Sequence, residues 1–268
     1  MLNRFGNTVT GDTLEFDEVL PNIDTVVFLN DTWEVFGSYS QSFSIAELGR
    51  VIRDSGTFGA GDTFSAKTFE TVAETVDNYE LGFRHFGDVF AFSAVAFYSE
   101  SDNGTTFDQD LVLQKFSETI SGIELAANYI FSDTVSFGGS ASWAEGERDS
   151  QDNEKVDLDN TRISPMKLTA YTEFRPRPGW QNRLQVMYVG DREPDTGADA
   201  GFASGDVSTY TIVDFSSSFD LGPGRFNVAV ANLLNRDYYP AVNQAFNANF
   251  GFSKGPGRTL SLGYSVDY

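Results

Sequence analysis

Apolar and polar residues alternate along much of the chain. In the last ten residues (TLSLGYSVDY), Leu260, Leu262 and Tyr264 share one face, while small polar residues occupy the positions between them. Because successive side chains of a β-strand point to opposite faces, this pattern predicts a strand with one apolar and one hydrophilic face. Alternating or continuously apolar segments of this kind predict eleven strands, at 24–29, 33–43, 76–86, 89–98, 122–130, 134–143, 166–175, 180–189, 209–219, 225–234 and 259–268.

The connections between these segments alternate in length. Short ones are predicted at 30–31, 87–88, 132–133, 177–179 and 221–224, and long ones at 44–75, about 101–118, 146–162, 190–207 and 235–257. Long loops confined to one side are rare in compact soluble domains and typical of transmembrane β-barrels. The pattern predicts an all-β fold, an antiparallel transmembrane β-barrel meander in which Leu260, Leu262, Val135 and Phe137 face lipid.

The number of strands is odd, whereas single-chain bacterial barrels have even numbers. The N-terminal residues MLNRFGNTVTGDTLEF have neither the charged region nor the apolar region of a signal peptide. Either the protein stays in the cytosol or the chain lacks its true beginning. Together the two features favour a partial barrel, from a truncated or split gene, with a loop segment at 1–23 and the C-terminal half of a barrel at 24–268.

Composition narrows the functional class. The longest apolar stretch, 89–97, is far shorter than the roughly 20 residues of a membrane-crossing helix. The absence of cysteine removes disulfides, thiolate metal sites and cysteine nucleophiles. A net charge of −21 argues against nucleic acid as a partner.

Candidate reactive groups are sparse. His85 is the single histidine, so a zinc site would need three carboxylates. The chain has no G-x-S-x-G motif, and 59–68 (GAGDTFSAKT) lacks the residue order of a phosphate-binding loop. The acidic segment 145–159 offers oxygen ligands for Ca²⁺ but lacks the D-x-D-x-D-G order, which favours a solvated loop. We therefore predict no enzyme, no cofactor and no metal site; a hydrolase built on a serine and His85 is a minor alternative.

Several stretches resemble the C-terminal half of TonB-dependent outer-membrane receptors. They are VDNYELGFR (76–84), AFSAVAFY (91–98), SGIELAANY (121–129), VANLLNRDYYPAVNQ (230–244) and GPGRTLSLGYSVDY (255–268). The segment QSFSIAELGRVIR (41–53) is most similar to receptors for ferric hydroxamate or citrate-hydroxamate siderophores of the aerobactin and schizokinen kind.

This resemblance implies an outer-membrane receptor that takes up ferric siderophores. Its implied partners are the siderophore, the TonB energy-coupling complex acting through a missing N-terminal region, outer-membrane lipid and the barrel assembly machinery. In the family, a plug domain and a coupling box precede a barrel of twenty-two strands, and the chain ends on an aromatic residue similar to the assembly signal. Tyr268 stands where phenylalanine is usual. A passive porin is the alternative transport function.

Ligand contacts are expected on the long-loop side. A ferric siderophore is often anionic and bulky, so arginines and aromatic residues suit it. Arg50 and Arg53, with no acid between them, are favoured over Arg192, which lies between Asp191 and Glu193. The resemblance gives Asn232, Leu233 and Tyr238 an architectural role at the end of a strand. The full set of predicted ligand contacts is Arg50, Arg53, Arg192, Tyr238, Tyr239 and Phe246.

Overall fold

The described residues form one antiparallel sheet. The computed structural model describes residue 15 and residues 17–45, 73–107, 113–150, 154–197, 205–246 and 253–266. The strands are β1 (Asn22–Phe28), β2 (Trp33–Ile45), β3 (Ala73–Phe86), β4 (Phe90–Phe107), β5 (Leu113–Ile130), β6 (Val135–Asp149), β7 (Lys155–Asp157), β8 (Lys167–Arg177), β9 (Trp180–Val189), β10 (Tyr210–Leu221), β11 (Gly224–Ala231) and β12 (Thr259–Val266). A short helix, α2 (Ala241–Ala245), precedes β12.

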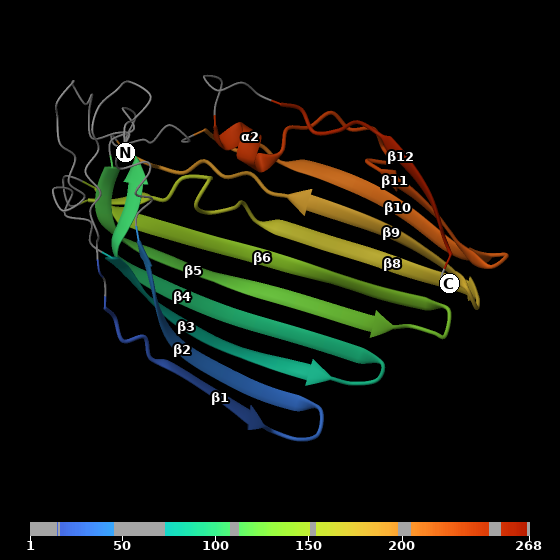
Figure 1. Ribbon diagram of the computed structural model, residues 1–268, viewed down its shortest axis with the longest axis horizontal. Coiled ribbons are helices and arrows are strands. Elements are labelled where there is room, and N and C mark those ends of the chain that lie inside the picture. Colours follow the sequence, from blue (N-terminus) through green and yellow to red (C-terminus); the bar gives the residue numbers. More distant parts are fainter. Residues whose placement is uncertain are drawn as a thin grey trace.

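The predicted meander of eleven strands is confirmed. Each strand pairs with the next along the chain, in the order β1-β2-β3-β4-β5-β6-β8-β9-β10-β11-β12. The three-residue strand β7 lies outside this path, pairs with β6, and was not predicted. Figure 1 shows the hairpin turns at one end of the strands and α2 at the other.

Two of the predicted long loops are wrong in extent. β4 continues to Phe107 and β5 begins at Leu113, so most of the predicted loop 101–118 is paired strand. β6 likewise continues to Asp149, into the predicted loop 146–162. These extensions are rich in polar residues, so the apolar alternation stops while the backbone ladder goes on.

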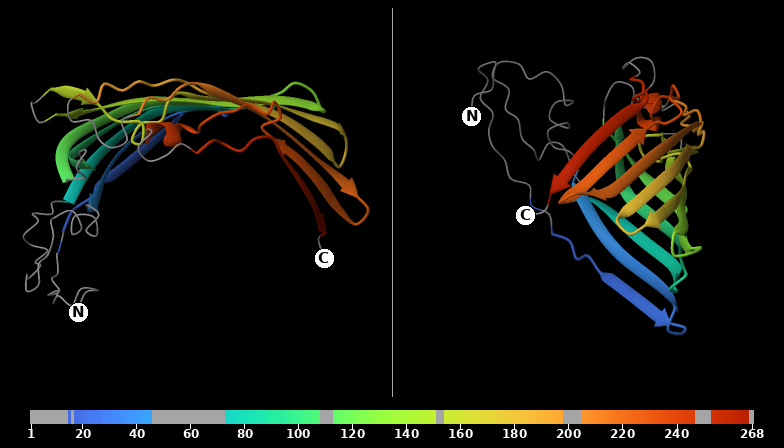
Figure 2. Two further views of the ribbon diagram at one scale, coloured as in Figure 1. Left: turned by 90° about the horizontal axis from the view of Figure 1, so that it is seen from above. Right: turned by 90° about the vertical axis from the view of Figure 1, so that its right-hand side faces the viewer.

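The sheet curves into an open wall. Figure 2 shows it as an arch, with α2 on the concave side. β1 and β12 lie at its two edges and do not pair with each other in the described parts of the chain. Among the described residues, no helix is long and apolar enough to cross a membrane.

The convex face is apolar. Cross-strand partners lie on the same face, so register aligns Leu125 with Ala141 and Leu168, and Val228 with Leu262. Of the four residues predicted to face lipid, Leu260, Leu262 and Phe137 are exposed (61%, 64% and 45%), and Val135 is partly exposed. All four lie on this face, none packed in a closed core.

Aromatic residues border the convex face at two levels. Near the long-loop side, the rings of Tyr39 and Tyr79 lie 5.1 Å apart and those of Tyr79 and Tyr98 6.3 Å apart. Near the short turns, Trp33 neighbours Phe83 across the β2–β3 pair. Trp33 and Tyr39 are six residues apart on one strand, about 20 Å at the rise of an antiparallel strand. We call the apolar surface between these two levels the band.

The concave face is polar and carries ion pairs. Arg84 pairs with Glu34 (2.8 Å) and lies over the Phe36 ring. Glu173 pairs with both Arg175 and Arg183. A sheet with an apolar outer face and a charged inner face is the arrangement expected of a barrel wall.

Candidate functional site

Two loops and α2 pack together over the long-loop end of the concave face. Figure 1 places them beside the ends of β6, β9 and β10. Their contact centres on buried apolar side chains, Leu158, Ile163, Val207 and Ala245, each at most 2% exposed. Gly146 on β6 makes this approach possible, because a Cβ there would lie 2.8 Å from Leu158 and 2.9 Å from Ile163. We call this assembly, residues 158–166, 190–197, 205–209 and 241–246, the cap.

Asn160 and Arg192 join the loops of the cap. The buried Asn160 amide donates to the carbonyls of Arg192 (3.2 Å) and Gly205 (2.9 Å). The Arg192 guanidinium donates to Asn160 Oδ1 (3.0 Å) and to the Leu158 carbonyl (2.8 Å). Burial lowers the pKa of Arg192 from its usual value, opposed by nearby carboxylates led by Asp157. These bonds connect segments more than thirty residues apart in sequence.

A second hydrogen-bonded centre lies where β11 ends. Asn232, with a positive φ of 49°, accepts from the backbone N–H of Arg236 and donates to the carbonyls of Arg236 and Pro256. Its own backbone N–H donates to Asp214 (2.8 Å). Asparagine tolerates the left-handed backbone conformation better than most residues. These contacts support the predicted architectural role of Asn232.

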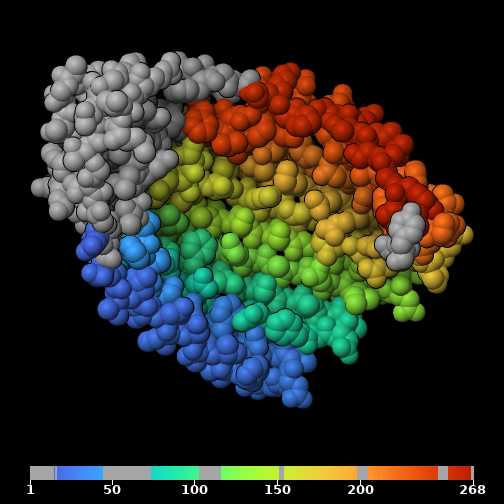
Figure 3. All heavy atoms as spheres, in the orientation of Figure 1, coloured from blue at the N-terminus to red at the C-terminus, as the bar shows by residue number. Residues whose placement is uncertain are grey.

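A hollow of about 600 Å³ lies beneath the cap. Its floor is a row of cross-strand partners on the concave face, which runs from Glu124 through Ser142, Lys167 and Val189 to Tyr210. The space-filling view from the same side shows the C-terminal segments along the upper edge of the molecule (Figure 3). The hollow therefore combines polar, aromatic and charged groups at the long-loop end of the wall.

Two cations line this hollow, and they differ in their surroundings. Arg162 forms an ion pair with Glu118, which is only 2% exposed and whose Oε1 has no hydrogen-bond partner among the described residues. The backbone of Arg162 is held by an Asx turn, in which Asp159 accepts from the N–H groups of Thr161 and Arg162. Lys167 is exposed, and within the described parts of the chain no carboxylate lies in ion-pair reach of it. Lys167 thus has no ion-pair partner among the described residues, and Glu124 lies two strands away in the same row of the floor.

The residues predicted to bind ligand have different positions. Arg50 and Arg53 lie outside the described residues. Arg192 lies in the cap, where it bonds the loops together. The tilted rings of Tyr238 and Tyr210 lie with their centroids 5.1 Å apart, beside a hollow of about 250 Å³ that both tyrosines line.

The last two predicted contacts adjoin the helix of the cap. The Tyr239 carbonyl accepts from Gln244, and Phe246 ends α2. The structure therefore groups Arg192, Tyr238, Tyr239 and Phe246 around the cap. Sequence reasoning missed Arg162 and Lys167, although the alternation in 166–175 places Lys167 opposite the apolar Leu168.

The remaining candidate groups do not form a reactive centre in the described residues. His85 lies among aromatic rings near the short turns. Its ring centroid is 4.4 Å from that of Trp33 and 5.8 Å from that of Phe90. No group of three or more His, Asp or Glu side chains placed to hold a metal ion occurs there. The described part of the acidic segment 145–159 contains the end of β6 and all of β7.

Comparison with known proteins identifies the family. Residues 3–233 match the family described as "TonB dependent receptor-like, beta-barrel". The chain belongs to this family. It is 28% identical to a ferric aerobactin receptor of Klebsiella pneumoniae, over 97% of this chain and 37% of that protein. It is 32% identical to a ferric aerobactin receptor of Escherichia coli, over 71% of this chain and 26% of that protein.

Solved structures of this fold include the ferric citrate transporter FecA (TM-score 0.70, 19% identity, 92% of this chain and 38% of that one). The ferric yersiniabactin receptor FyuA of Yersinia pestis is another (TM-score 0.68, 20% identity, 94% and 37%). The TonB-dependent receptor chain described here thus spans little more than a third of the length of most of these proteins. The relatives named above are transport receptors.

Proposed function

We propose that the chain forms the C-terminal half of the barrel wall, and part of the extracellular cap, of an outer-membrane receptor that takes up ferric siderophores with energy from TonB. The observation that carries this proposal is the pairing of a lipid-compatible convex band with a charged concave hollow under the long-loop cap. The family match and the aerobactin receptors among its relatives support it. In the proposed receptor, the short turns are periplasmic and the cap is extracellular.

The proposed ligand is a ferric hydroxamate or citrate-hydroxamate siderophore. A citrate-hydroxamate complex is anionic, and the chain has a net charge of −21, so its binding needs local positive potential. Lys167 supplies it in the hollow, where Arg162 is paired with Glu118, and Phe97 and Tyr210 supply apolar and aromatic surface. We keep Arg50, Arg53, Arg192, Tyr238, Tyr239 and Phe246 as proposed contacts from the surrounding loops.

Growth under iron starvation tests the function. A strain carrying the full-length reading frame, with its own siderophore synthesis deleted, should grow when supplied with ferric aerobactin and stop growing when the gene is removed. Restoration that does not depend on TonB would contradict the energy-coupled mechanism. Steady ion conductance by the reconstituted full-length protein would favour a porin instead.

Lys167→Gln tests the ligand site in the same receptor. The apparent affinity for ferric aerobactin should fall by about tenfold at low salt, because one charge-assisted contact is worth about 1.5 kcal/mol. Lys254→Gln is the matched control, since Lys254 lies on the long-loop side but pairs with Asp237. Equal effects of the two substitutions would show that only the overall charge matters.

A further inference from the structure

The floor of the hollow beneath the cap has an apolar row next to its polar one. Register places Phe97, Gly122 and Ala144 side by side on β4, β5 and β6. This row lies two residues along the strands, about 7 Å, from the row that contains Glu124 and Ser142, so both rows share the concave face. We call Phe97, Gly122 and Ala144 the apolar row. It is an exception on a concave face that is otherwise mostly polar.

The ring of Phe97 lies against Gly122. A Cβ at residue 122 would be 2.6 Å from Cζ and 2.8 Å from Cε1 of Phe97, so glycine leaves room for the ring. The ring therefore covers the backbone of β5 and gives the floor an apolar surface where Gly122 has no side chain. Ile120 and Met187 also line the hollow and extend this surface along β5 and onto β9.

Residues of the cap supply apolar surface on the other side of the hollow. Ile163 and Pro165, both buried, line it, and so does Ala241 at the start of α2. Floor and cap thus present apolar side chains to the same hollow of about 600 Å³. Water is held poorly in such surroundings, because it finds few polar partners there. The apolar part of the hollow therefore suits an aliphatic group better than water.

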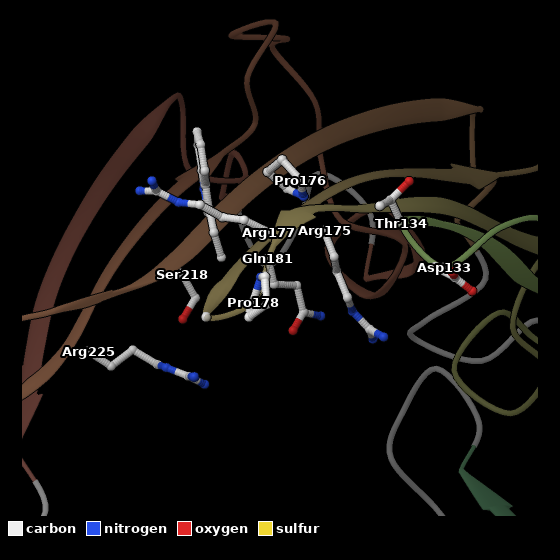
Figure 4. Close-up of a pocket in the computed structure, with 11 residues that line it drawn as sticks. Asp133, Thr134, Arg175, Pro176, Arg177, Pro178, Gln181, Ser218 and Arg225 are labelled. Atoms are coloured by element: carbon white, nitrogen blue, oxygen red, sulfur yellow. The ribbon is translucent and has the colours of Figure 1, made fainter.

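The hollow of about 430 Å³ beside the short turns has a different lining. Figure 4 shows Arg175 and Arg225 on either side of Gln181. Arg175 pairs with Glu173 and Arg225 with Asp220, each at 2.9 Å, so these charges are balanced within the wall. None of the residues that line this hollow is buried. The combination of an unpaired cation with buried apolar residues of the cap therefore distinguishes the hollow beneath the cap.

The polar row and the apolar row suit two parts of one ligand. Lys167 suits an anionic, iron-bearing head, and Glu124, two strands away, makes the other end of the polar row unsuited to an anion. The apolar row crosses two strand spacings, from β4 to β6, about 10 Å. An extended alkyl chain rises about 1.3 Å per bond, because its C–C bonds are about 1.5 Å long. A chain of about eight carbons therefore spans the apolar row.

We infer that the hollow beneath the cap takes a siderophore that carries an aliphatic acyl arm, with the arm between the apolar row and the cap and the iron-bearing head beside Lys167. The inference rests on the proposed function and names the class of siderophore that the hollow prefers. A membrane lipid is not the expected occupant, because the hollow lies on the concave face and the band that faces lipid lies on the convex one.

Two ferric citrate-hydroxamate complexes that differ in one acyl group test the inference. In the first, both hydroxamate acyl groups are acetyl; in the second, octanoyl replaces one acetyl. Binding of each complex, labelled with radioactive iron, is measured on cells that carry the full-length receptor and lack TonB, so that uptake does not contribute. Cells without the receptor gene give the amount that partitions into the membrane. The octanoyl complex should bind at least about tenfold more tightly, because burial of two methylene groups already gives a factor of this size.

Ala144→Phe should reduce the ratio of the two affinities to about one, because the larger side chain fills the space above the apolar row. Ala126→Phe is the matched control and should keep the ratio, since Ala126 lies on the concave face between Ser93 and Ser140 and does not line the hollow. Met187→Gln changes the polarity of the lining with little change in volume. It should lower the ratio several-fold and replaces Ala144→Phe if that variant does not reach the outer membrane.

Equal affinities for the two complexes would overturn the inference and leave the proposed function standing. A tenfold ratio that persists in both Ala144→Phe and Met187→Gln would do the same. Displacement of the octanoyl complex by an equal concentration of octanoate would also overturn it, because the hollow would then bind alkyl acids without an iron-bearing head. Absence of receptor-dependent binding of both complexes would instead contradict the proposed function, and this inference with it.

Discussion

The band and the cap are stabilised in different ways. In the band, the same alternation repeats from strand to strand, and the backbones of neighbouring strands pair along their length. In the cap, few residues alternate, and the order depends on individual side chains such as Asn160, Arg192 and Gln244. A periodic surface tolerates changes among apolar residues, whereas a hydrogen-bonded centre depends on one residue type at one position.

A charge placed in the middle of the band should have the largest effect. Leu125 lies midway along the band on the convex face, next to Ala94 and Ala141. Leu125→Arg should destabilise the protein folded in lipid vesicles by about 2–4 kcal/mol, because a charge at the bilayer midplane loses its hydration. Urea titration of the vesicle-bound protein measures this.

Ala126→Arg is the control for that experiment. Ala126 is the next residue on the same strand and lies on the concave face, between Ser93 and Ser140. An arginine there remains hydrated, and its cost should be well below that at position 125. Equal costs at the two positions would contradict the assignment of the convex face to lipid.

The same contrast explains what the sequence could predict. Segment 180–189 alternates between its flanking turns, and β9 (Trp180–Val189) has those bounds. The upper parts of β4 and β5 were missed because polar residues such as Ser101 and Glu118 lie on extensions where no apolar face is required. Alternation of apolar and polar residues therefore predicts a strand only where one face of the strand contacts an apolar environment.

The candidate site was harder to predict than the wall. Arg162 reaches the hollow through an Asx turn and an ion pair to a residue 44 positions away, and such long-range contacts leave no periodic trace. Arg192 was chosen for its charge, yet its hydrogen bonds to Asn160 and Leu158 became visible only in the folded chain. Its proposed role in ligand binding stays a prediction.

Loss of the Asn160 amide should open the cap and leave the band intact. Asn160→Ala removes two donated bonds and the acceptor of Arg192, and it should cost about 1–3 kcal/mol of local stability because buried partners lose their bonds. Limited proteolysis should then cut within 190–209 faster, with an unchanged β-sheet signal in circular dichroism. Asn243→Ala, which removes one exposed bond to Ser253, should not accelerate cleavage there. A loss of sheet signal in Asn160→Ala would show that the cap and the band fold as one unit.

The smallest effect is expected where the band meets the long-loop side. The Tyr39 hydroxyl donates to Asp77 (2.8 Å), which also accepts from Gln41 (3.1 Å). Tyr39→Phe keeps the ring contact with Tyr79 and removes one hydrogen bond to a charged, partly exposed group, so it should cost about 0.5–1.5 kcal/mol in vesicles. Tyr39→Ala should cost more, since it also removes the ring that borders the band. If Tyr39→Phe and Tyr39→Ala were equally destabilising, the ring of Tyr39 would add nothing to stability. The hydrogen bond to Asp77, and not contact of the ring with lipid, would then stabilise this border of the band.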